Sequence, residues 1–86
     1  MTEMIIYSKD HCPYCDRAKA LLSEKGIGYE EIRVDLDPEA FHTMLEKSKR
    51  RTVPQIFFGD KHIGGFDDLW ALEQSGELEP LVNQTK

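Results

Sequence analysis

The chain alternates short β-favouring runs with segments of helical periodicity, and this order restricts the fold more than any other feature. Four runs predict strands: Glu3–Tyr7, Tyr29–Val34, Gln55–Phe58 and Lys61–Ile63. The last two flank Gly59-Asp60, so we expect them to form a hairpin. The first two are separated by a helical segment, which predicts parallel strands joined by a right-handed crossover.

The helical segments complete this pattern. Three helices and a last helical turn are predicted, beginning at Pro13, Pro38, Asp67 and Leu78. Proline suits the first turn of a helix, where its missing N–H has no partner to lose. The order β-α-β-α-β-β-α predicts an α/β protein with a thioredoxin-like fold, in which a four-stranded mixed sheet is flanked by helices.

Length and charge narrow the possible functions. The 86 residues suffice for one domain, spanning residues 1–86, and we expect a folded monomer. A net charge of −5 disfavours binding to nucleic acid or to an anionic membrane, because both need clustered lysine and arginine. One basic cluster is present, and it fits the carboxyl end of the second helix: Lys47, Lys49, Arg50 and Arg51.

The amino terminus predicts the cellular compartment. Its Met-Thr-Glu-Met-Ile-Ile-Tyr sequence lacks the basic region and the long apolar stretch of a secretion signal. No run is long enough to cross a bilayer. We therefore expect a cytoplasmic protein, in a compartment that keeps thiols reduced and rarely uses cysteines as structural cross-links.

The chemistry is expected at Cys12-Pro13-Tyr14-Cys15, at the start of the first helix. Two cysteines three residues apart on a helix face the same side and can close a small disulfide ring. The unpaired N–H groups and partial positive charge of the helix amino terminus stabilise a thiolate, and Cys12 gains most from them. Cys15 lies one turn deeper, so we assign it the resolving role.

Other uses of the cysteine pair fit less well. A structural zinc site needs four ligands, and this chain offers one pair and three scattered histidines. A permanent disulfide between Cys12 and Cys15 would restrain little of the unfolded chain.

Two residues near Cys12 have more than one interpretation. Lys9 either assists the thiolate or binds a substrate carboxylate, or it is an ordinary solvated lysine. For His11 we favour a solvent-facing histidine with no special role.

Three segments in this order resemble the signature segments of the dithiol glutaredoxins. They are Lys9 through Cys15, Thr52-Val53-Pro54, and Gly64-Gly65-Phe66-Asp67-Asp68. The resemblance covers essentially the whole chain, and the short length is similar to that of the small bacterial members. It implies a glutathione-dependent thiol-disulfide oxidoreductase that takes glutathione as co-substrate and needs no metal.

The resemblance also implies a glutathione site. Pro54 would be a cis proline beside the cysteines, and the Val53 backbone would pair in strand fashion with the cysteinyl residue of glutathione. Backbone N–H groups of Asp67 and Asp68 would hold a carboxylate, while the Asp68 side chain would meet the glutamyl ammonium or simply cap the helix. The full implied set is Lys9, Tyr14, Arg51, Thr52, Val53, Pro54, Gly65, Phe66, Asp67 and Asp68.

Within this set, Lys9 and Arg51 would attract the glycyl carboxylate, and Tyr14 would flank the reacting sulfur. The chain departs from the family pattern at Ser48-Lys49-Arg50-Arg51, where a glycine is common, which leaves the position of the basic contact open. Phe66 stands where many members carry a further cysteine, so no third thiol is available for regulatory oxidation.

The implied partners are glutathione and glutathionylated or disulfide-containing proteins, with glutathione reductase acting only through glutathione. Three alternatives stay open. One is a redoxin that takes electrons from thioredoxin reductase and lacks a glutathione site. Another is an iron-sulfur carrier that uses Cys12 and glutathione across a dimer, against which Pro13 and Cys15 argue. The last is a copper chaperone, for which a cis Pro54 beside the cysteines would hinder metal access.

Overall fold

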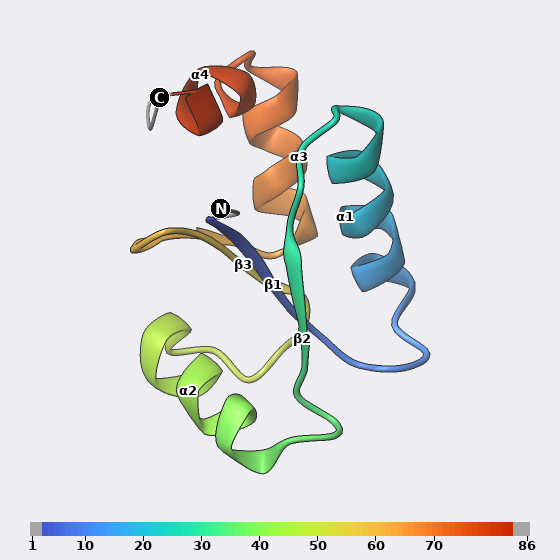
Figure 1. The fold of residues 1–86 in the computed structure, drawn as a ribbon, viewed down its shortest axis with the longest axis vertical. Coiled ribbons are helices and arrows are strands. Elements are labelled where there is room, and N and C mark those ends of the chain that lie inside the picture. Colours follow the sequence, from blue (N-terminus) through green and yellow to red (C-terminus); the bar gives the residue numbers. More distant parts are fainter. Residues whose placement is uncertain (1–2, 84–86) are drawn as a thin grey trace.

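The computed structural model describes residues 3–83 as a sheet with helices on both faces (Figure 1). Its strands are β1 (Met4–Ser8), β2 (Glu30–Arg33), β3 (Gln55–Phe58) and β4 (Lys61–Gly64). Its helices are α1 (Pro13–Glu24), α2 (Pro38–Ser48), α3 (Phe66–Gln74) and α4 (Leu78–Asn83). The predicted fold class and element order are confirmed. No helix in this range is both long and apolar enough to cross a membrane.

The sheet is mixed, as predicted, with the strand order β2-β1-β3-β4. β1 runs parallel to β2 and antiparallel to β3, and β3 and β4 form the predicted hairpin. β2 is shorter than the predicted Tyr29–Val34. A turn closed by the Leu36 N–H and the Arg33 carbonyl, 3.3 Å apart, ends this edge strand early.

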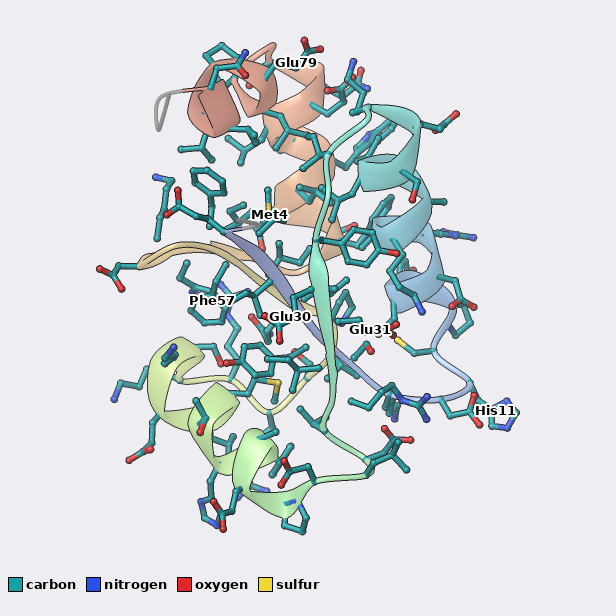
Figure 2. All side chains as sticks on the ribbon, in the orientation of Figure 1. Met4, His11, Glu30, Glu31, Phe57 and Glu79 are labelled. Atoms are coloured by element: carbon teal, nitrogen blue, oxygen red, sulfur yellow. The ribbon has the colours of Figure 1, made fainter. Side chains whose placement is uncertain are left out.

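Helices cover both faces of the sheet, which explains why β1 and β3 are almost continuously apolar. Figure 2 shows Met4 on the face toward α3 and α4, and Phe57 on the face toward α2. Met4 belongs to a core cluster that includes Leu22 of α1, Leu69 of α3 and Leu78 of α4. Phe57 belongs to a second cluster, which α2 closes.

The carboxyl end of α2 lies within the basic cluster, so some of its residues belong to the helix and others follow it. The Asp37 side chain caps the helix start by accepting the Glu39 N–H at 3.0 Å. At the other end Lys49 adopts a left-handed conformation with φ 60°, which turns the chain out of the helix. Of the four basic residues, only Lys47 lies in the last helical turn. The expectation that the whole cluster forms a helix end is therefore wrong for Arg50 and Arg51, which follow that turn.

We predict that Leu22→Ala destabilises the fold by about 2–5 kcal/mol, because it leaves a cavity in the core. Leu22 is 0% exposed, whereas Leu36 is 73% exposed and offers the same substitution at the surface. Urea unfolding of both variants checks this. An equal loss of stability in Leu22→Ala and Leu36→Ala would contradict the core packing described here.

Candidate active site

Cys12 sits at the junction of β1 and α1 and is the N-cap residue of the helix. Its Sγ accepts a hydrogen bond from the Cys15 N–H, with a sulfur-to-nitrogen distance of 3.2 Å. A sulfur that replaces the usual oxygen of an N-cap receives both this N–H and the positive end of the helix dipole. Cys12 therefore occupies the amino terminus of α1, the position that the sequence predicts for it. Cys12 is 8% exposed, so the residue is largely buried but still reached by solvent.

Cys15 differs from Cys12 in its surroundings. It is fully buried in the first turn of α1, and both cysteines are free thiols. Burial, followed by the hydrogen bond with Cys12, raises the pKa of the Cys15 thiol to about 12. The two thiols are therefore unequal, and a group that stays protonated until it is needed fits the resolving role.

The segment before β3 faces Cys12 from the other side of the site. The Val53-Pro54 peptide bond is cis, which confirms the expectation for Pro54. The Val53 carbonyl oxygen lies 3.9 Å from the Cys12 Sγ. In the part of the chain that the structure describes, no hydrogen bond uses the Val53 N–H. The Val53 backbone thus keeps a free donor next to the reactive sulfur.

A groove of about 290 Å³ begins at this segment. Its walls come from the start of α1, the turn after α2, the cis-proline segment and the start of α3. The lining residues are Tyr14, Arg50, Thr52, Val53, Pro54, Gln55, Gly65, Phe66, Asp67 and Asp68. Segments that lie far apart in the sequence therefore form one surface beside Cys12.

The start of α3 forms one end of the groove. Its first N–H groups have no partner within the helix, which makes this end suited to an anion. The Asp68 Oδ2 accepts the Gly65 N–H at 3.0 Å and lies 3.4 Å from the Arg50 Nη1. Asp68 therefore caps the helix, one of the two roles expected for it. Gly64, with φ 122°, is needed here because a Cβ would also collide with the Asp68 carboxylate.

Aromatic rings form the wall above the groove. The Tyr14 and Phe66 ring centroids are 6.1 Å apart, and Phe66 stacks on Trp70 at 6.3 Å. Arg17 lies over the Tyr14 ring, 5.3 Å from its centroid. Tyr14 is 53% exposed, so it can contact a substrate beside Cys12. Phe66 fills, in this chain, the position at which the resemblance would allow a third cysteine.

The groove contains every residue predicted for glutathione except Lys9 and Arg51, which are exposed and do not line it. It also contains Arg50 and Gln55, which sequence reasoning missed. The left-handed turn at Lys49, together with the hydrogen bond from the Arg50 N–H to the Ser48 hydroxyl at 3.0 Å, sets the direction of the chain here. No spacing in the sequence signals which of the two arginines enters the groove.

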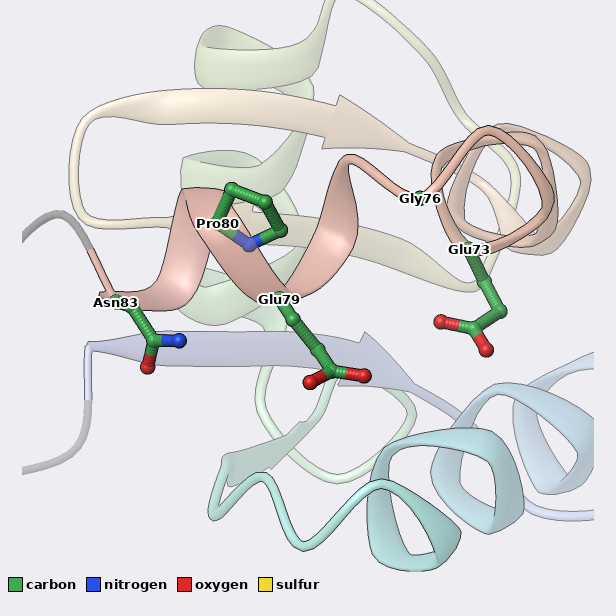
Figure 3. Close-up of a pocket in the computed structure, with 5 residues that line it drawn as sticks. All are labelled: Glu73, Gly76, Glu79, Pro80 and Asn83. Atoms are coloured by element: carbon green, nitrogen blue, oxygen red, sulfur yellow. The ribbon is translucent and has the colours of Figure 1, made fainter.

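Two further features lie outside this groove. His11 points into solvent, as expected (Figure 2). A second hollow, of about 520 Å³, lies between α3 and α4 (Figure 3). Two carboxylates on it, those of Glu73 and Glu79, already pair with Lys25 at 3.0 and 2.9 Å. Among residues 3–83 no three His, Cys, Asp or Glu side chains are gathered as metal ligands.

Cys12 lies at the amino terminus of a helix, Cys15 is buried beside it, and the segment with the cis Pro54 faces Cys12. This arrangement is that of a thiol-disulfide oxidoreductase with a thioredoxin-like fold. Comparison with known proteins narrows the class. The glutaredoxin family model matches residues 4–63. Glutaredoxin 3 of Escherichia coli strain K12 is 50% identical over 82 residues, which cover 95% of this chain and 99% of that protein.

Solved structures agree. The solution structure of glutaredoxin from Brucella melitensis has a TM-score of 0.85 and 50% identity, covering 100% of this chain and 94% of that chain. The crystal structure of a buckwheat glutaredoxin-glutathione complex has a TM-score of 0.88 and 33% identity, covering 95% of this chain and 77% of that chain. The chain belongs to the glutaredoxin family, and it is a disulfide oxidoreductase of the glutathione-dependent class. The resemblance inferred from its three motifs is confirmed.

We predict that iodoacetamide modifies Cys12 and spares Cys15 in the folded, reduced protein. With a pKa of about 12, the Cys15 thiol is ionised to only about one part in ten thousand at about pH 8, and it is buried. Peptide mass spectrometry gives the extent of labelling at each site, and unfolding in urea should make Cys15 reactive. Equal labelling rates in the folded protein would contradict the difference between the thiols.

Proposed function

We propose that this protein uses glutathione to reduce glutathione mixed disulfides and protein disulfides through Cys12 and Cys15. One observation carries the proposal: the groove of about 290 Å³ opens where the Cys12 Sγ lies 3.9 Å from the Val53 carbonyl. A tripeptide held in that groove has its own sulfur within reach of Cys12. The proposed site lies in a single glutaredoxin domain.

The groove offers complementary groups to each part of glutathione. The free Val53 N–H and its carbonyl can pair with the cysteinyl backbone in strand fashion. In the part of the chain that the structure describes, the N–H groups of Phe66 and Asp67 at the start of α3 have no hydrogen-bond partner, which suits them to the glutamyl carboxylate, and the Asp68 carboxylate suits the ammonium. Thr52, Pro54 and Gly65 shape the wall between these two ends.

A basic residue is needed for the glycyl carboxylate. Arg50 lines the groove, so it holds a positive charge inside the proposed site. Lys9 and Arg51 are exposed near its margins and contribute charge from solvent, where screening weakens it. We therefore rank Arg50 first among the three, with Lys9 and Arg51 as supporting residues.

The proposed first reaction needs only Cys12. Its thiolate attacks the glutathionyl sulfur of a mixed disulfide, forming a Cys12–glutathione disulfide and releasing the protein thiolate, which takes a proton from solvent. A second glutathione thiolate then attacks the glutathione sulfur on Cys12. This yields oxidised glutathione and restores the Cys12 thiolate, whose charge the Cys15 N–H stabilises.

Protein disulfides use both cysteines. Cys12 attacks one sulfur and forms a mixed disulfide with the substrate, releasing the first substrate thiol. Cys15 loses its proton, attacks the Cys12 sulfur and releases the second substrate thiol, leaving a Cys12–Cys15 disulfide. Two glutathione molecules then reduce this disulfide. Glutathione reductase acts indirectly, by returning oxidised glutathione to its thiol form.

The charge and chemistry of the chain suggest its setting. With a net charge of −5, we propose a monomer with neither nucleic acid nor a membrane as partner. A cytoplasmic location suits the mechanism, because the glutathione pool there is kept reduced. Glutathionylated and disulfide-containing proteins are the proposed substrates.

We predict that Cys12→Ser abolishes both activities and that Cys15→Ser abolishes one. NADPH consumption is followed with glutathione reductase, glutathione and either a small glutathione mixed disulfide or a disulfide-containing protein. Cys15→Ser should keep most turnover of the mixed disulfide and lose turnover of the protein disulfide, because only the latter needs a resolving thiol.

Two results of this assay would overturn the proposal. If the wild type is inactive with glutathione but active with NADPH and thioredoxin reductase, the protein is a redoxin without a glutathione site. If Cys15→Ser loses both activities equally while remaining folded, the division of roles between the two cysteines is wrong.

We predict that Arg50→Met raises the KM for the mixed disulfide about threefold to fivefold, the effect of losing one partly screened charge contact. Arg51→Met makes the same chemical change at the adjacent position, outside the groove, and should raise the KM less. Steady-state kinetics of both variants checks the ranking. A larger effect of Arg51→Met would move the basic contact to Arg51.

A further inference from the structure

Three polar residues, of which Thr52 and Gln55 line the groove, form a chain of hydrogen bonds that ends on the cis-proline segment. The Nε2 of His62 in β4 lies 2.8 Å from the Oε1 of Gln55 in β3. The Nε2 of Gln55 donates to the Thr52 carbonyl at 3.0 Å and contacts the Thr52 hydroxyl at 3.2 Å. Gln55 is 1% exposed, so this chain is shielded from solvent at its centre.

The direction of these hydrogen bonds is fixed by the Thr52 carbonyl, which can only accept. The Gln55 amide must therefore turn its NH₂ group toward Thr52 and its oxygen toward His62. An amide oxygen is also only an acceptor, so His62 must carry a proton on Nε2. His62 thus selects one of the two orientations of a buried amide.

Packing holds the His62 ring in place for this contact. The ring stacks on Phe57, with centroids 4.7 Å apart and an interplanar angle of 29°. The register between β3 and β4 shifts at Ile56/Phe57, so that Phe57 pairs with His62 while Ile56 pairs with Gly64. Because Phe57 pairs directly with His62 and lies two residues after Gln55 on β3, the side chains of Gln55 and His62 share one face of the sheet.

The charge state of His62 agrees with this role. Burial and the nearby Arg50 lower the pKa of His62, against an opposing contribution from Asp68. The ring is therefore mainly neutral at neutral pH, with its single proton on Nε2. A neutral donor orients the amide without adding a second positive charge beside Arg50.

We propose that His62 and Gln55 are positioning residues, which hold the Thr52-Val53-Pro54 segment in its glutathione-binding conformation. This inference rests on the proposed function, because it concerns the same groove. With the Thr52 carbonyl bound to Gln55, the next free donor in the described part of the chain is the Val53 N–H, while the Val53 carbonyl faces the Cys12 sulfur. The hydrogen bonds from His62 through Gln55 to Thr52 therefore determine which backbone group of the segment faces the substrate. Neither His62 nor Gln55 takes part in the reaction.

The kinetic test compares His62→Phe, His62→Gln and Gln55→Met. Phenylalanine keeps a ring to stack on Phe57 and removes the donor, whereas glutamine restores a donor of similar reach. His62→Phe and Gln55→Met should raise the KM for a small glutathione mixed disulfide about fivefold, the effect of one hydrogen bond, with kcat within about twofold of wild type. His62→Gln should recover most of the loss.

The matched control is His42→Phe, the same substitution at an exposed position of α2. It should leave the KM unchanged. If His62→Phe and Gln55→Met fold and keep the wild-type KM, or if kcat falls with KM unchanged, the positioning role is wrong while the proposed function stands. If the wild type itself shows no glutathione-dependent turnover, the proposed function is wrong.

A second measurement needs no variant. In ¹⁵N-labelled wild-type protein at neutral pH, the imidazole nitrogen signals of His62 should show the proton on Nε2. The side-chain amide protons of Gln55 should also be protected from exchange. A neutral His62 protonated on Nδ1 would overturn the inference, whatever the variants do.

Discussion

The hydrogen bond from the Cys15 N–H to the Cys12 sulfur is the interaction on which the site depends. It makes a cysteine serve as the N-cap of α1, so the sulfur is held at the positive end of the helix. Because β1 delivers the chain to this point and Pro13 starts the helix, the position of the sulfur follows from the fold itself. The same arrangement buries the Cys15 thiol one turn deeper in the helix, and this burial raises the pKa of Cys15.

The strand order explains why the rest of the groove forms beside this sulfur. β1 lies at the centre of the sheet next to β3, so the segment that enters β3 lies beside the chain that leaves β1. The hairpin then returns through β4 to the start of α3, which supplies the far wall. A central strand between a parallel and an antiparallel neighbour thus gathers segments about forty residues apart in the sequence.

Local patterns in the sequence were sufficient for the fold and for the reactive pair. Alternating strands and helices, the two prolines that start α1 and α2, and the cysteine spacing each have short-range physical causes. Which arginine lines the groove was not predictable, because the choice between Arg50 and Arg51 depends on the left-handed turn at Lys49. Gln55 was also missed, since its partner His62 is brought close only by the pairing of β3 with β4 in the hairpin.

The capping role of Cys12 makes helix stability and electron transfer parts of one thermodynamic cycle. A thiolate is a charged acceptor for the Cys15 N–H, whereas a sulfur in a disulfide is a neutral and weaker one. This one hydrogen bond therefore contributes more to the first turn of α1 when Cys12 is a thiolate than when Cys12 is part of a disulfide. By linkage, a change that strengthens this hydrogen bond to the thiolate also favours the reduced state, so the backbone of α1 acts as part of the redox couple.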